Sequence, residues 1–242
     1  MFHKMFHNRA AGKKLTRRGR TAGAAASLGA ALIAVGIGTH PAAAGAGTTL
    51  PSRPATASTA FTGSAAALAG PGLGSGNLVQ SEDFFQQGLA PVGATVDMTG
   101  KQALSACSGE ETMRTLTKGK AGAYADVTWT FDTKGVMLRE SAADGSTDTS
   151  AASYEKQLNK LVSGCQDEPA GHWYYGKGHA ITVKAGEGTW YPAFNGDGKV
   201  AGGVAVIRSG HRFGIVELSG QPSDDPGYME GIAAGAVNRL AG

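Results

Sequence analysis

Residues 200–219 read VAGGVAVIRSGHRFGIVELS, and this stretch decides the fold. Two apolar runs, Val200–Arg208 and His211–Ser219, flank the dipeptide Ser209-Gly210, which is typical of a tight turn because glycine tolerates positive φ. Side chains alternate between the two faces of a strand. In both runs the odd-numbered and the even-numbered positions hold apolar residues, so both faces of each strand are apolar. Strands of this kind need cover on both faces. The stretch therefore predicts a hairpin within a sheet that is covered on both sides.

Earlier parts of the chain carry further strand patterns. Ala123, Val127 and Phe131 belong to an apolar series that alternates with polar residues, which indicates a half-buried strand. Glycine-containing turns separate the runs and favour antiparallel pairing in a meander. The strands predicted before the hairpin are residues 123–131, 136–142, 179–184 and 189–194, with residues 94–99 as a further candidate.

Two helices complete the predicted fold. Between residues 149 and 164, one helical face collects the apolar residues Tyr154, Leu158, Leu161, Val162 and Cys165. The last helix follows Pro226, and its apolar face holds Met229, Ile232, Ala233, Ala236, Val237 and Leu240. The element order β-β-α-β-β-β-β-α predicts an α+β fold, an antiparallel sheet of about six strands with two main helices packed on one face.

The N-terminal 44 residues are predicted to be a signal peptide. A basic segment without acids precedes the apolar run Ala22–Gly38, and Ala42 and Ala44 supply the small residues that a signal peptidase needs. The alternative is a transmembrane anchor, although a run of Ala and Gly is weakly apolar and short for a bilayer. Residues 45–77, rich in Ala, Gly, Ser, Thr and Pro, are predicted to be a flexible tether. The folded domain is predicted to span residues 78–242, in a secreted protein without a stable membrane anchor.

Net charge argues against nucleic acid as a partner. Of 22 basic residues, seven precede residue 45, whereas all 19 acidic residues follow it. The mature chain would therefore carry 15 basic and 19 acidic residues, a net charge of −4. No basic run remains that could follow a phosphate backbone.

Cys107 and Cys165 are the only two cysteines of the chain. In an oxidising compartment an isolated pair is most simply one disulfide, which here would fix the end of the helix over residues 149–164. The alternative is two buried free thiols. Neither a C-x-x-C redox motif nor the cysteines and histidines of a zinc site are present in the sequence.

No catalytic motif stands out, and catalytic residues, metal ligands and cofactors are not expected. The sequence contains no G-x-S-x-G, H-E-x-x-H or P-loop pattern. The mature part holds three histidines, His172, His179 and His211, which lack a metal-ligand spacing. Catalytic residues dispersed along the chain, as in a hydrolase, stay an alternative.

Four aromatic residues are the candidate ligand-binding side chains: Trp173, Tyr175, Trp190 and Tyr191. Aromatic faces on a sheet can stack on sugars or other flat ligands. Alternatively, these rings fill the core between sheet and helix. Trp190 and Tyr191 are consecutive in a strand and must point to opposite faces, so at most one of them can join a given site. A ligand groove is predicted on the sheet face away from the helices, unless residues 78–118 cover that face, or at the end where Trp173 and Tyr175 enter.

The pattern resembles the extracytoplasmic, sensor-type domains of actinobacterial PknH-like receptor kinases and related secreted proteins. The matching features are the helix that ends at Cys165, the aromatic Trp173, the hairpin Val204–Val216 and a final helix ending in Ala236–Leu240. The resemblance implies an α+β fold with a groove beside the sheet, no established enzymatic activity and an unknown ligand. The kinase sensor of the family has two disulfides, whereas this chain can form one.

The expected function is therefore that of a secreted, non-catalytic ligand-binding or sensor-like domain acting at or outside the cell envelope. Its partner would be a small molecule, a glycan or an envelope protein. The alternatives are a secreted hydrolase, and an envelope or inhibitor protein that acts through its surface.

Cleavage of the signal peptide after Ala44 should leave Gly45 as the first residue of the mature protein. N-terminal sequencing of the form found in the culture medium tests this. A membrane-bound product that retains Ala22–Gly38 would contradict it.

Overall fold

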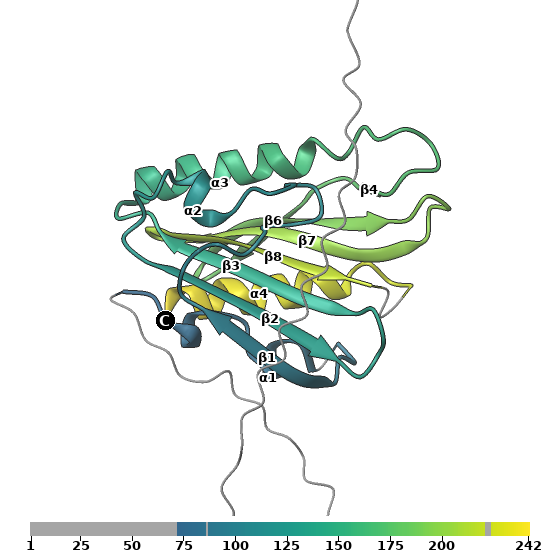
Figure 1. Ribbon diagram of the computed structural model, residues 1–242, viewed down its shortest axis with the longest axis horizontal. Helices are drawn as coiled ribbons and strands as arrows, with labels where there is room; N and C mark the ends of the chain where they lie inside the picture. Colours follow the sequence, from purple (N-terminus) through teal and green to yellow (C-terminus); the bar gives the residue numbers. More distant parts are fainter. Residues whose placement is uncertain (1–71, 86, 221–223) are drawn as a thin grey trace, which may run out of the picture. The chain divides into compact units, whose positions relative to one another are not determined.

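The computed structural model describes residues 72–85, 87–220 and 224–242, and these build one antiparallel sheet with helices on its two faces (Figure 1). The signal peptide and most of the predicted tether lie outside the described residues. The strands are β1 Pro91–Asp97, β2 Tyr124–Phe131, β3 Met137–Asp144, β4 Tyr174–Tyr175, β5 His179–Val183, β6 Gly186–Phe194, β7 Val200–Ser209 and β8 Arg212–Ser219. The helices are α1 Ser81–Phe85, α2 Met113–Leu116, α3 Asp148–Ser163 and α4 Tyr228–Ala241, and a 3₁₀ turn covers Ser75–Asn77.

The sheet joins two meanders side by side. Its order is β1-β2-β3-β8-β7-β6-β4, and β5 pairs with the other half of the β6 edge. The antiparallel pairing of β3 with β8 connects the first meander to the second, with Ser141 opposite Ile215. The prediction of about six strands was too low, because β1 and the two-residue strand β4 complete a sheet of eight.

The predicted hairpin lies near the centre of this sheet and is buried on both faces. Val204 and Val206 face one hydrophobic cluster, while Ala205 and Ile207 face the other. All four side chains are fully buried. The predicted burial of both faces of the hairpin is therefore confirmed.

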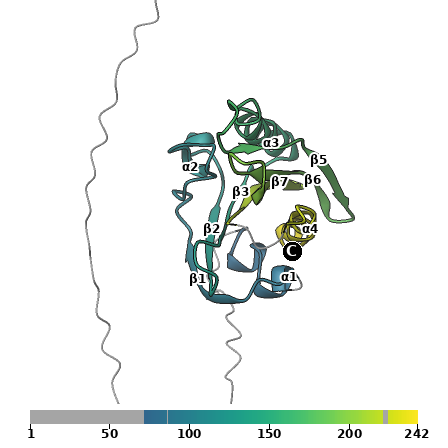
Figure 2. The ribbon, with the colours of Figure 1, turned by 90° about the vertical axis from the view of Figure 1, so that its right-hand side faces the viewer.

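The placement of the two long helices on one face was wrong. Helix α3 packs on β7 and β8 from one side, and α4 packs on β5, β6, β7 and β8 from the other (Figures 1 and 2). The connectivity explains this, since α3 carries the chain from β3 across the sheet to β4, and α4 crosses back after β8. Each helix thus covers one of the two apolar faces of the central hairpin.

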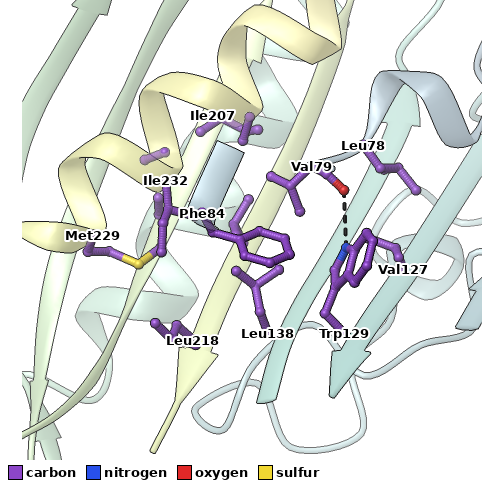
Figure 3. Close-up of a cluster of buried hydrophobic side chains, with 14 of the residues drawn as sticks. Leu78, Val79, Phe84, Val127, Trp129, Leu138, Ile207, Leu218, Met229 and Ile232 are labelled. Atoms are coloured by element: carbon purple, nitrogen blue, oxygen red, sulfur yellow. Dashed lines mark hydrogen bonds between the residues drawn. The ribbon is translucent and has the colours of Figure 1, made fainter. Parts of the chain in front are cut away.

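The α4 face holds the larger apolar cluster, which Figure 3 shows around Phe84 and Trp129. The two rings meet edge to face with centroids 5.1 Å apart. Helix α4 contributes Met229 and Ile232 from the opposite side of this cluster. Leu73 is also buried here, so the packed chain begins before the predicted boundary at residue 78.

Side chains of the sheet hold the segment before α1 by its backbone. The Trp129 indole Nε1–H donates to the carbonyl of Val79 at 3.1 Å (Figure 3), and the Val79 N–H donates to Glu140 Oε2 at 2.5 Å. Glu140 is fully buried, and burial raises its pKa from 4.5 to about 8. The side chain is therefore mainly protonated at pH 7. Its Oε1 atom has no hydrogen-bond partner among the described residues.

Replacing Glu140 with glutamine should remove a pH dependence of stability. The pKa of Glu140 is higher in the folded protein than in the unfolded chain. The contribution of this side chain to the free energy of unfolding is therefore fully present below pH 4.5 and is lost as the pH rises toward 8. Across this range the wild type should lose about 1.4 kcal/mol of unfolding free energy per pH unit through Glu140, and E140Q should not show this loss. Urea unfolding at several pH values measures the difference.

The exposed residue Glu110 provides the matched control, since E110Q should follow the wild type. A stability difference between E140Q and the wild type that stays constant from pH 5 to pH 8 would show that Glu140 is ionised in the folded protein.

Candidate functional site

A disulfide joins Cys107 to Cys165, with Cα atoms 6.0 Å apart, and confirms the predicted pairing. Cys107 begins the α2 segment, defined as residues 107–122, and Cys165 follows the C-terminal end of α3. At the other end of this segment, the Gly122 N–H donates to the carbonyl of Asp144 at 2.9 Å. Thr147, the N-cap of α3, lies three residues beyond Asp144. The α2 segment is thus attached close to both ends of α3.

Two neighbouring cavities lie between the α2 segment and α3, and we call them together the α3 groove. Their volumes are about 460 and about 780 Å³. They share the lining residues Leu116, Lys118 and Gln157. The smaller cavity adjoins the N-terminus of α3 and is the N-terminal half of the groove, and the larger cavity is its C-terminal half.

The C-terminal half combines an apolar floor with charged side chains. Leu116, Leu161 and the disulfide supply the apolar surface. The charged residues are two lysines and two acids: Lys118, Lys160, Glu111 and Glu168. This half can accept an aliphatic group and has no excess of either charge.

The N-terminal half is richer in hydroxyl groups and carries positive charge. Its polar lining consists of Thr117, Lys118, Lys120, Thr147, Thr149, Ser150, Ser153, Tyr154 and Gln157, without an acid or a histidine. The Tyr154 ring stacks on the buried Phe213 with centroids 5.0 Å apart, which holds this wall of the cavity on the sheet.

Backbone strain also concentrates at the N-terminal half. Among the described residues, the non-glycine residues with positive φ are Lys118, at 54°, and Ser146, at 65°. Lys118 lines both cavities, and Ser146 precedes the lining residue Thr147. Residues held in such sparsely populated conformations gather at functional sites, because other interactions of the fold must enforce them.

A buried carboxylate supports the start of the α2 segment. Glu217 on β8 accepts hydrogen bonds from the Ala106 N–H at 2.7 Å and from the Tyr175 hydroxyl at 2.8 Å. It also pairs with Arg139 of β3. Burial and the adjacent carboxylate raise the pKa of Tyr175, which keeps its hydroxyl protonated as a donor. This network holds the residues next to Cys107 against the sheet.

None of the four predicted aromatic residues lines the α3 groove. Tyr175 and Tyr191 are buried on the α3 face, where Trp173 packs half-buried against Tyr175 at 4.5 Å between centroids. Trp190 is buried on the α4 face, with His179 stacked on it at 4.4 Å. The Tyr191 hydroxyl donates to Asn159 at 2.8 Å. Ring packing and hydrogen bonds to the protein thus occupy most of this aromatic surface.

One of the two predicted positions of the groove, the sheet face away from the helices, was wrong, whereas a site at the end where Trp173 and Tyr175 enter stays a prediction. No sheet face lies away from the helices, since α3 and α4 cover opposite faces. The groove lies beside α3 instead, and sequence reasoning missed its lysines and hydroxyl groups, because exposed polar residues of this kind carry no pattern. Lys118 before Gly119 at a helix end is the single signal that could have suggested an unusual backbone.

Within residues 72–85, 87–220 and 224–242, no group of three or more His, Cys, Asp or Glu side chains is placed to hold a metal ion. Over those same ranges, no helix is long and apolar enough to cross a bilayer.

Comparison with known proteins leaves the family open. No protein-family model and no curated protein matches the chain. Among solved structures, it is similar to the extracellular domain of PknH from Mycobacterium tuberculosis, with 15% identity, a TM-score of 0.48 and coverage of 72% of this chain and 97% of that chain. A likeness at this level identifies neither a family nor a function, so membership of the PknH-like family stays a prediction.

Loss of the disulfide should destabilise the domain. The bridge closes a loop across a sequence separation of 58 residues. The chain-entropy relation gives about 4 kcal/mol for this loop as an upper value. Guanidinium unfolding of C107A/C165A should show a lower midpoint than the oxidised wild type, and the reduced wild type should behave like the variant. Equal midpoints for the oxidised wild type and the variant would contradict a structural role for the bridge.

Proposed function

We propose that this protein is an exported, non-catalytic ligand-binding domain and that the α3 groove is its binding site. The observation that carries the proposal is the division of the groove into a hydroxyl-rich, positively charged half and a half with an apolar floor. Ligand sites combine apolar surface with a few polar groups that fix the orientation of the ligand.

The shape of the groove favours an elongated, amphipathic ligand. The two cavities follow α3 from Thr147 to Cys165, and a helix of 16 residues is about 24 Å long. Each cavity has a volume in the range of small-molecule sites. Cavities of this volume suit a small molecule better than the broad surface of an envelope protein.

The lining favours binding over catalysis. The hydroxyl groups of the N-terminal half have no imidazole or carboxylate beside them in the lining, and such a group is the usual general base for a hydroxyl nucleophile.

Export is supported by the disulfide, since structural disulfides form and persist in oxidising compartments. The predicted signal peptide and tether would release the domain outside the cell or hold it there. The binding site would then face molecules of the envelope or of the medium.

A bulky side chain in the middle of the groove should block binding. Gln157 lines both cavities, so Gln157→Trp should fill their junction. The neutral fluorescent probe N-phenyl-1-naphthylamine should bind the wild type through the apolar floor and lose at least about tenfold in affinity with Gln157→Trp.

The matched control is Lys156→Trp, which places the same side chain on the adjacent exposed residue, in a surface hollow beside Arg208 that shares Thr149 and Ser153 with the N-terminal half but no residue of the apolar floor. Its probe affinity should equal that of the wild type. Absence of probe binding by the wild type, or equal losses in both variants, would contradict the assignment of the α3 groove.

A further inference from the structure

We propose that the N-terminal half of the α3 groove binds the phosphate group of a phosphate monoester. This inference rests on the proposed function and specifies the chemistry of the ligand at one end of the same site. The adjoining apolar floor would receive the rest of the ligand where that part is aliphatic.

Charge selects the N-terminal half for an anion. Lys118 and Lys120 both line this cavity, and its lining contains no acid. Neither ammonium group forms an ion pair within the described residues, whereas Arg139, Arg208 and Arg239 all pair with carboxylates there. In the C-terminal half, by contrast, Glu111 and Glu168 balance the lysines. The groove as a whole is lined by three lysines and two acids, so its one excess positive charge lies at the N-terminal end, where no acid lines the cavity.

Hydroxyl donors at the same place suit a phosphate group, which offers three acceptor oxygens. The side chains of Thr149 and Ser153 line the cavity, and neither hydroxyl has a hydrogen-bond partner in the protein within the described residues. The Ser150 hydroxyl differs, because it donates to the carbonyl of Gly145. Two hydroxyl groups thus remain available beside the two lysines.

The strained backbone at Lys118 supports a role for its side chain in binding. A lysine with a φ of 54° occupies a conformation that glycine adopts without a steric penalty, and Gly119 follows with a φ of 70°. Glycine at position 118 would therefore favour stability. A lysine at this position is explained if its ammonium group contacts the ligand, since stability is commonly lost where a residue serves function.

Two sources of a phosphate monoester share this chemistry. One is a small phosphorylated molecule that occupies the N-terminal half alone. The other is a single-chain phospholipid whose alkyl chain lies along Leu116 and Leu161 in the C-terminal half. The apolar floor should add to the affinity of the protein for the phospholipid but not for the small phosphorylated molecule.

Isothermal titration calorimetry with glycerol 3-phosphate, and with monomeric oleoyl lysophosphatidic acid, tests the inference and distinguishes the sources. Both ligands should bind the wild type. K118G should reduce the affinity for both by at least about tenfold while raising the melting temperature by about 2 °C. The control K134Q removes an exposed lysine from the turn between β2 and β3, outside both cavities, and should leave both affinities unchanged.

The second variant, L161E, charges the apolar floor while leaving the lysines in place. A lipid source predicts that lysophosphatidic acid binds more tightly than glycerol 3-phosphate and that L161E removes only this excess. Equal affinities for the two ligands, both insensitive to L161E, indicate a small phosphorylated molecule.

Absence of binding of both phosphate ligands, or binding that K118G leaves unchanged, would overturn the inference. Such a result together with intact binding of N-phenyl-1-naphthylamine in the groove would leave the proposed function standing. If N-phenyl-1-naphthylamine also fails to bind, both the phosphate inference and the proposed function are contradicted.

Discussion

The β7–β8 hairpin must be buried on both faces, and the rest of the described fold depends on this constraint. Val206 and Ile207 are consecutive, point to opposite sides and are both fully buried. Exposing either face to water would reduce the free energy of unfolding by about 25 cal/mol for each Å² of apolar surface. The chain meets the constraint by crossing the sheet twice, once with α3 and once with α4, and the hairpin lies between them.

The groove follows from how the α3 face is covered. A helix is about 10 Å wide and strands lie about 4.8 Å apart, so one helix covers about two strands of a much wider sheet. Helix α3 covers β7 and β8, and the α2 segment extends the cover on this face toward β3. The Cys107–Cys165 disulfide and the contact between Ala106 and Glu217 fix the α2 segment at the junction. Two covering elements that meet over one sheet leave a groove between them, and here polar side chains line its rim.

The sequence predicted what local patterns determine, and it missed what the chain decides at long range. Both long helices, the hairpin and the disulfide follow from periodicity, turn residues and cysteine count. The face that each helix takes depends on the crossing direction, which periodicity does not encode. Gly186 and Gly188 fall between two predicted strands, 179–184 and 189–194, but lie inside β6. Glycine is needed at both positions, because a Cβ atom would come within 2.2 Å of the Arg208 carbonyl or 2.5 Å of the Val206 carbonyl on β7. The α3 groove was missed, since exposed lysines and hydroxyls carry no periodic pattern and only long-range packing brings them to one cavity.

Thiol labelling of two consecutive positions tests whether the hairpin is buried on both faces. Val206→Cys and Ile207→Cys are made separately, and their alkylation by N-ethylmaleimide is followed in the native, non-reduced protein. Both thiols should be protected alike and react only through global unfolding, because α3 covers one and α4 the other. Rapid labelling of either position, at the rate of an exposed thiol, would contradict it.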